Sequence, residues 1–197
     1  MYDVALAVCA GVSLAAACGF RVFVPLLGLS VATAAGVVSP AKGWEWVGTA
    51  PAIVALAVAT VLELAAYYIP WVDHLLDTIA TPTAIGAGTV AAGLVLPVDE
   101  PWLRWVAAAI TGGGAAGAVQ TGTVLARGIS GGTTGGLGNW LVATAENAAS
   151  IVLSILAIVV PIIAAILVIG ILAYVVRNGK RVVQFFRRRA APTPDVA

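Results

Sequence analysis

TAPAIVALAVATVLELAAYYIP, residues 49–70, is an apolar stretch that carries one charged residue, Glu63. A second stretch of this kind, NWLVATAENAASIVLSILAIVVP, covers residues 139–161 and carries Glu146. As a helix, each is long enough to cross the roughly 30 Å hydrocarbon core of a membrane. An ionised carboxylate at that depth costs at least ~2.5 kcal/mol, so each glutamate is expected to have a partner, a proton or a function there.

The composition of the whole chain indicates the same class of protein. Of its 197 residues, 61% are hydrophobic and 10% are charged, whereas soluble domains carry about 25% charged residues. The apolar stretches are continuous, which favours helices over the alternating strands of a β-barrel. The sequence therefore predicts an all-α fold, a polytopic transmembrane helical bundle. We expect residues 1–176 to form a single transmembrane domain and residues 177–197 a basic tail.

The first apolar run, residues 4–38, is too long for one crossing. As a straight helix it would measure ~52 Å. A break is predicted within residues 18–25, where Gly19 permits irregular backbone, Pro25 removes a hydrogen-bond donor and Arg21 adds a charge. Broken or re-entrant helices are tolerated at membrane depth only where they are buried in protein or line a wet cavity. The break is therefore also a functional clue.

Prolines, glycines and tryptophans divide the rest of the chain. Trp pairs at 44 and 46 and at 102 and 105 fit an interfacial aromatic belt. The remaining segments are expected to be an interfacial helix from Pro70 with Asp73 and Asp77 on its polar face, a short span over 82–97 begun by Pro82, a flexible Gly-rich loop within 128–139, and a last helix from Pro161 to about 176.

The order of these segments suggests an internal duplication with halves 1–98 and 101–176. In each half an Ala-rich broken segment precedes a Glu-bearing helix and a helix begun by proline, and Gly112–Gly114 would be the second break. No arginine is matched to Arg21 in the second half, where Gln120 is the nearest polar residue. The similarity is weak because Ala, Val and Gly match by chance, and hydropathy leaves open whether a repeat is inverted or parallel.

Two motifs carry a resemblance to a known family: GFRVFVPLL at residues 19–27 and PWVDHLLDTIATP at residues 70–82. With the two Glu-bearing helices, the chain resembles a bacterial family of small membrane proteins catalogued as a domain of unknown function. The resemblance covers nearly the whole chain. It implies no activity.

Candidate binding residues follow from the buried charges and the helix breaks. Arg21 is expected to pair with Glu63 or Glu146, because an unpaired guanidinium and an unpaired carboxylate at similar depth would each cost several kcal/mol. A purely structural role for Arg21 stays open. The candidate site for an ion or solute consists of Arg21, Glu63, Glu146, Gly19, Gly113, Gln120 and Asn147. Gly113 and Gly117 also have the spacing of close helix packing.

Several classes of function are not expected. The chain has one histidine, and no nucleophile with a base, cofactor motif or metal-ligand cluster is recognisable, so we expect no enzyme activity, no cofactor and no metal site. Asp73 and His74 are adjacent and diverge on a helix, which argues against a metal there. Six of the ten basic residues follow the last apolar run, which predicts a cytoplasmic C-terminus that contacts anionic headgroups and no nucleic acid.

Two functions remain. The first is a transporter or channel for a small ion or solute, in which Arg21 attracts anionic groups and Glu63 and Glu146 carry protons or cations. The second is a lipid-handling or membrane-assembly protein that packs through small residues. We expect a multi-pass protein of the bacterial plasma membrane, surrounded by lipid and assembled as a homo-oligomer.

Overall fold

The protein is a bundle of helices. The computed structural model describes the backbone of residues 4–134 and 137–189, and the side chains of these residues except 70–77 and 178–189. No strand occurs in these ranges. The expected all-α bundle is therefore confirmed.

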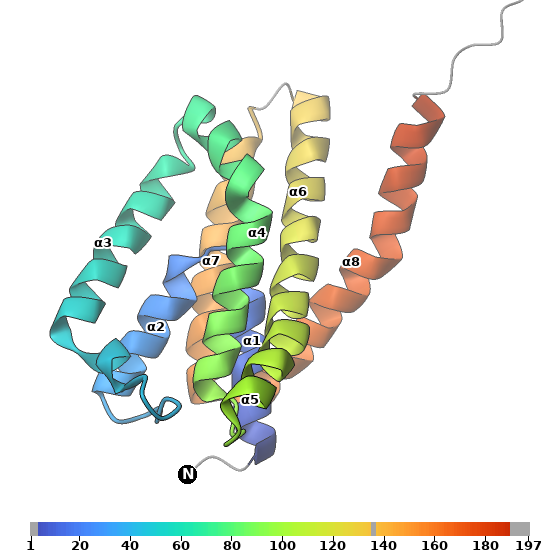
Figure 1. The fold of residues 1–197 in the computed structure, drawn as a ribbon. Coiled ribbons are helices and arrows are strands. Elements are labelled where there is room, and N and C mark those ends of the chain that lie inside the picture. Colours follow the sequence, from blue (N-terminus) through green and yellow to red (C-terminus); the bar gives the residue numbers. More distant parts are fainter. Residues whose placement is uncertain (1–3, 135–136, 190–197) are drawn as a thin grey trace, which may run out of the picture.

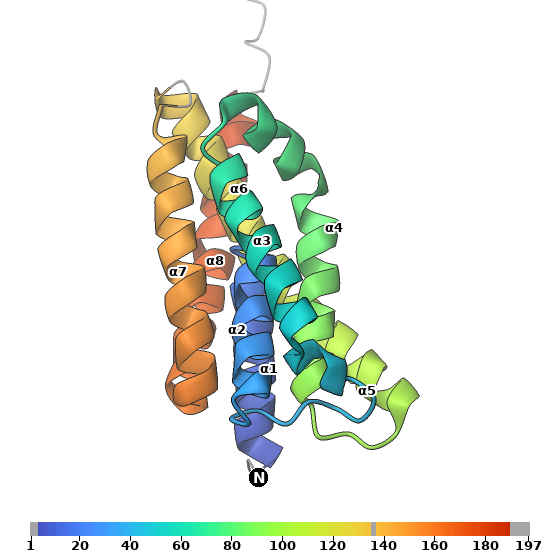
Figure 2. The same cartoon turned by 90° about the vertical axis from the view of Figure 1, so that its left-hand side faces the viewer.

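The helices follow one another with short connections. In chain order they are α1 Val4–Cys18, α2 Phe23–Ala34, the 3₁₀ helix η1 Glu45–Gly48, α3 Ala50–Ala66, α4 Pro70–Val95, α5 Pro101–Ala108, the π-helix η2 Ala109–Gly113, α6 Gly114–Thr134, α7 Asn139–Val159 and α8 Pro161–Arg189. The long helices alternate in direction along one axis: α3 runs from the end of the bundle that holds the start of α1 to the opposite end, α4 returns, the α5–α6 run ascends, α7 descends and α8 ascends (Figures 1 and 2).

Residues 4–34 form a helical hairpin that enters the bundle and turns back inside it. The predicted break is confirmed at residues 19–22, between α1 and α2. The two helices have 15 and 12 residues, so at 1.5 Å per residue they measure only ~22 and ~18 Å. Both views place the turn between them part-way along the bundle and not at its far end. The run is therefore re-entrant.

Helix α1 lies at the centre of the bundle. It packs against α4, α6, α7 and α8, and its residues from Leu14 to Cys18 are at most 1% exposed. Small side chains allow this, because alanine and glycine let helix backbones approach closely. Gly11, for example, faces the backbone of Ala92 in α4. A central helix of small residues brings four other helices around the hairpin turn.

Helix α4 corrects the prediction of two separate elements around Pro82. The interfacial helix and the short span are one helix of 26 residues, with Pro82 inside it. A proline removes one hydrogen bond from a helix interior and bends it, and the α4 ribbon is curved in Figure 2. The side chains of Asp73 and Asp77 lie outside the described residues, so their predicted interfacial position stays a prediction.

The Gly-rich stretches of the second half are helical, contrary to expectation. Gly112–Gly114 does not reverse the chain: a π-helical turn, Ala109–Gly113, joins α5 to α6 within one continuous helical run. The loop expected from residue 128 begins only after Thr134, because α6 continues to that residue. Glycine lowers helix propensity by about 1 kcal/mol without forbidding a helix. In both places, packing against other helices outweighs the low helix propensity of glycine.

The exterior of the bundle is apolar. The stretch Thr78–Val95 of α4 and the whole of α7 are long and apolar enough to cross a membrane, and four further apolar helical segments are shorter. Large hydrophobic side chains such as Val61 of α3 and Ile166 of α8 are more than 60% exposed. Pro161 begins α8 as expected, but the helix continues beyond 176 to Arg189. Within the predicted basic tail, side chains are described only for Arg177, which is exposed.

Candidate functional site

Arg21 is buried at the turn of the α1–α2 hairpin. It is 2% exposed, and its guanidinium donates to the turn itself and to α7. One Nη donates to the Phe20 carbonyl at 2.7 Å, the other to the Ala143 carbonyl of α7 at 3.2 Å, and Nε donates to the Asn147 side chain. A planar guanidinium with five donors suits such a site, because it satisfies several acceptors at once. Arg21 therefore fastens the hairpin turn to α7.

Glu146 of α7 lies between two buried arginines. Its Oε2 accepts a hydrogen bond from Arg21 Nη1 at 2.9 Å, and Arg127 of α6 donates to both of its oxygens, to Oε1 at 3.3 Å and to Oε2. Glu146 is 5% exposed and Arg127 is 7% exposed. The predicted pairing of Arg21 with Glu146 is confirmed. Charge-assisted hydrogen bonds of this kind are about twice as strong as neutral ones.

Tyr67 provides an aromatic face for both arginines. The guanidinium carbon of Arg21 lies 3.9 Å from the centre of its ring and that of Arg127 lies 4.4 Å away. Cation–π contacts at such distances contribute about 0.5–2 kcal/mol each. Tyr67 directly follows α3, so this ring connects α3 to the ion pairs of α6 and α7.

Glu63 of α3 binds backbone rather than a side-chain cation. Its two carboxylate oxygens accept the backbone N–H groups of Val22, at 2.7 Å, and Phe23, at 2.9 Å. These N–H groups begin α2 and have no partner within the helix. The N-terminus of a helix also carries a partial positive charge, which favours a carboxylate. Glu63 thus caps α2 from a neighbouring helix, because the break at residues 19–22 leaves these donors uncovered.

Neutral polar groups of α7 complete the site. The Asn147 amide donates to the Tyr68 hydroxyl at 3.3 Å, and that hydroxyl lies 3.0 Å from the Thr144 hydroxyl. One turn along α7 from Asn147, the Ser150 hydroxyl donates to the carbonyl of Ala17 at 3.1 Å. Both ends of the hairpin turn are therefore hydrogen-bonded to other helices.

We call Arg21, Glu63, Tyr67, Arg127 and Glu146 the charged cluster. With both arginines and both glutamates charged its formal charge is zero, but the two guanidinium groups share the single Glu146 carboxylate. Glu146 is therefore the acceptor that joins the two arginines.

The other predicted site residues lie apart from the charged cluster or serve packing. A β-carbon on Gly19 would lie 2.5 Å from the Ala116 carbonyl oxygen, and one on Gly113 would lie 2.8 Å from the Thr89 hydroxyl. Both glycines thus allow helices to touch. Gln120 is buried on α6, two turns before Arg127. No residue in the described part of the chain hydrogen-bonds to its side chain.

Arg127 and Tyr67 were missed by the sequence analysis. Arg127 lies in the stretch assigned to a Gly-rich connection, so the helix that buries it was not expected there. Arg127 lies seven residues after Gln120, which is two helical turns, and this spacing could have indicated a helix with both side chains on one face. Within the described ranges no group of three His, Cys, Asp or Glu side chains gathers as a metal site.

Comparison with known proteins gives a family and no activity. Residues 8–181 match the model of a family described as Domain of unknown function (DUF4126). No match was found among curated proteins or among solved structures.

Proposed function

The chain belongs to the DUF4126 family, and on the geometry of its charged cluster we propose that it is a membrane transporter for a small ion or solute. The observation that carries the proposal is the position of Glu146, a carboxylate held between two buried arginines at the turn of a re-entrant hairpin. Such turns, inside a bundle and lined by polar groups, are where transporters with broken helices bind their substrates.

The surface of the bundle supports its insertion in a membrane. Exposed valine, leucine and isoleucine side chains cover α3, α7 and α8, among them Val54, Leu62, Ile155 and Ile169. A contiguous apolar exterior around a buried ionic centre is the distribution that a bilayer requires, because charges inside a membrane face the bundle interior. The aromatic rings of Trp44, Trp46 and Trp105 gather at the end of the bundle that holds the start of α1, as an interfacial belt would.

Two arginines favour an anionic substrate. In the proposed cycle, Glu146 takes up a proton and releases Arg21 and Arg127, which then bind the anion in its place. Loss of the proton restores the carboxylate, which competes with the anion and expels it. One proton and one anion therefore move together. The two arginines bind an anion strongly only in a buried site, where water does not weaken charge-assisted hydrogen bonds.

Helix α3 is the element best placed to open the site. It packs against α2 and η1, and it contributes Glu63 and, just beyond its end, Tyr67 to the charged cluster. Displacement of α3 would uncover the α2 N-terminus and the arginines together. We propose that α3 moves as a gate, since local opening occurs where packing contacts are fewest.

Flux measurements on reconstituted protein test the proposal. We expect proteoliposomes to take up a small anion from a panel of chloride, phosphate, acetate and succinate, and an inward proton gradient to accelerate the uptake. Glu146→Gln imitates the protonated carboxylate, so it should retain downhill anion flux and lose the response to the gradient. The matched control is Glu100→Gln, an exposed carboxylate outside the charged cluster, which should behave as the wild type.

Two results would contradict the proposal. One is the absence of flux for every anion and for sodium and potassium in folded wild-type protein. The other is an unchanged proton response in Glu146→Gln. Because the substitution also affects stability, flux is compared between equal amounts of folded protein, measured by size-exclusion chromatography after extraction from the liposomes.

An apolar groove favours a second candidate, lipid handling. A cavity of about 290 Å³ lies between α2, α3 and α7, and its lining includes Leu27, Thr60, Leu64 and Ile155. Thr60 and Leu64 are neighbours of Glu63 on α3, so an acyl chain in this groove would place its headgroup near the charged cluster. Transfer of a fluorescent phospholipid between leaflets, without flux of any small ion, would favour this function.

The location, the orientation and the oligomeric state of the protein are also proposals. We propose that the protein lies in the plasma membrane of a bacterium with its C-terminal end in the cytoplasm, as a multi-pass protein that forms homo-oligomers.

A further inference from the structure

Arg104 of α5 is a buried side chain with no hydrogen-bond or ion-pair partner among the residues that the structure describes. It is 7% exposed, and its Nε is buried and makes no hydrogen bond. Neither a hydrogen bond nor an ion pair joins its side chain to any residue that the structure describes. A buried polar nitrogen without a hydrogen bond is costly. Arg104 is therefore a candidate for binding a ligand.

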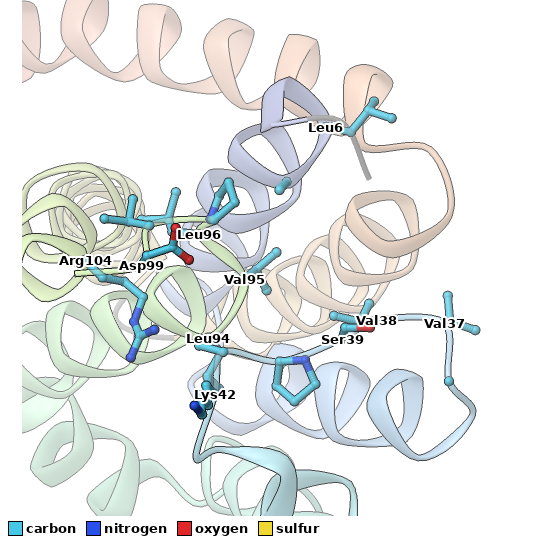
Figure 3. A pocket seen from close by; sticks show the side chains of 16 residues that line it. Leu6, Val37, Val38, Ser39, Lys42, Leu94, Val95, Leu96, Asp99 and Arg104 are labelled. Atoms are coloured by element: carbon cyan, nitrogen blue, oxygen red, sulfur yellow. The ribbon is translucent and has the colours of Figure 1, made fainter. Parts of the chain in front are cut away.

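A cavity of about 800 Å³ adjoins Arg104. Its walls are the start of α1, the loop after α2, the end of α4 and α5, and the volume is within the ~300–1,000 Å³ of small-molecule sites. Figure 3 shows the Arg104 and Lys42 side chains, from α5 and from the loop, among the residues that line the cavity. Much of the remaining lining is aliphatic and includes Leu6, Val38 and Leu96.

The charge of the lining favours an anion. Arg104 and Lys42 are opposed only by Asp99, which is exposed and forms no ion pair with either within the described ranges. Outside the lining, Glu45 reduces the field of Lys42: backbone hydrogen bonds from its own N–H and from Gly43 lower the pKa of this exposed carboxyl, and it is ionised at neutral pH. The buried Arg104 is thus the main source of positive charge in the cavity.

We propose that this cavity binds an anionic group attached to an apolar body, with the anion on Arg104 and Lys42 and the body against the aliphatic wall. An alkyl phosphate has this chemistry, whether it belongs to a soluble metabolite or to a phospholipid at the membrane surface. The nearby Trp44 and Trp105, whose rings are 5.6 Å apart, fit a site at the level of the headgroups. The site is separate from the charged cluster and goes beyond the transport proposal.

Butyl phosphate is the probe for this site. It is titrated calorimetrically against the full-length protein in nanodiscs of phosphatidylcholine, and butyltrimethylammonium, which has the same body and the opposite charge, serves as the ligand control. We expect binding of butyl phosphate only. Arg104→Gln should weaken binding at least about tenfold, because the charge-assisted hydrogen bonds from the guanidinium to the phosphate are lost. Arg177→Gln, an exposed arginine on α8, should leave the affinity unchanged.

Hydrogen exchange of the wild type gives a test that needs no variant. Butyl phosphate should slow amide exchange in residues 36–42 and 94–99, which line the cavity. Absence of binding, equal affinity of Arg104→Gln, or protection confined to other segments would overturn the proposal. Nanodiscs that contain phosphatidylglycerol distinguish the two sources of the ligand: competition with butyl phosphate identifies a lipid headgroup, and an unchanged affinity identifies a soluble anion.

Discussion

Glu146 pairs with two arginines, so its replacement should lower the stability of the protein more than the replacement of Arg21. Glu146→Gln leaves Arg21 and Arg127 buried without their carboxylate, whereas Arg21→Ala leaves Glu146 paired with Arg127. Loss of a partner from a buried ion pair typically costs ~3–5 kcal/mol. We expect the melting temperature to fall most in Glu146→Gln, less in Arg21→Ala, and to recover partly in the double variant, which removes one uncompensated cation.

The control for this series is Glu100→Gln, which lies at the exposed start of α5 and should leave the melting temperature unchanged. An additive double variant, with no recovery, would contradict the coupling of Arg21 to Glu146.

Individual charges were the most predictable part of the site. Arg21, Glu63 and Glu146 stand out because each interrupts an apolar stretch, and the cost of an unpaired charge predicts proximity. The partner that completes the network, Arg127, was hidden by glycines that signal a loop in water and pack as a helix here. The capping of α2 by Glu63 could not be predicted, because the sequence gives the position of a break and not the helix that will face it.

Two glycines of one helical run should respond in opposite ways to alanine. A β-carbon on Gly112 would lie 2.5 Å from the Ala92 β-carbon and against the Gly88 carbonyl oxygen of α4, whereas one on Gly114 would meet nothing within 4 Å. We expect Gly112→Ala to destabilise the protein by ~1–3 kcal/mol through overpacking. Gly114 has helical φ and ψ of −63° and −45°, so Gly114→Ala should add stability of up to ~1 kcal/mol.

Thermal or chemical unfolding of the two variants beside the wild type measures both effects. Equal stabilities would mean that α4 and the π-helical turn do not touch as closely as the structure places them.

The cap on α2 can be tested at the level of single amides. Glu63→Ala removes the acceptors of the Val22 and Phe23 N–H groups, so hydrogen exchange at these amides should accelerate while exchange in α7 is preserved. Glu63→Gln retains one acceptor oxygen and should give an intermediate rate. Uniform acceleration throughout the bundle would indicate general destabilisation and contradict a local capping role.

Helix lengths and breaks were predicted unevenly, for physical reasons. The re-entrant run was expected because 35 apolar residues exceed the membrane thickness. Pro82 has the position expected of a helix start but lies inside α4, because neighbouring helices can re-satisfy the backbone groups that a proline frees. The internal duplication remains untested, although the Glu-bearing helices α3 and α7 run in opposite directions.

At the scale of the whole bundle, we expect its two ends to lie on opposite sides of the membrane. The start of α1 and the loop after α2 lie at one end, and α8 finishes at the other (Figure 1). With the basic end of α8 in the cytoplasm, a reporter fused after Ala197 should be active only in a cytoplasmic format. The same reporter inserted at Gly43, an exposed position with φ of 87°, should be active only in a periplasmic format. Activity of both fusions on one side would contradict the arrangement.

The composition predicted a bundle of helices, but it did not predict how the helices pack against one another. Hydropathy identifies apolar runs and gives no information on which run is central. The central position of α1 depends on matched small residues in helices far along the chain, as at Gly19 and Ala116, and such pairing cannot be derived from one sequence.

The central position of α1 has a consequence for biogenesis. Helix α1 precedes in the chain all four helices against which it packs, α4, α6, α7 and α8, and neither arm of its hairpin is long enough to cross a membrane by itself. Contacts between the two ends of a chain form slowly, because long loops must close first. We therefore expect the hairpin to take its place in the bundle only after these later helices have formed.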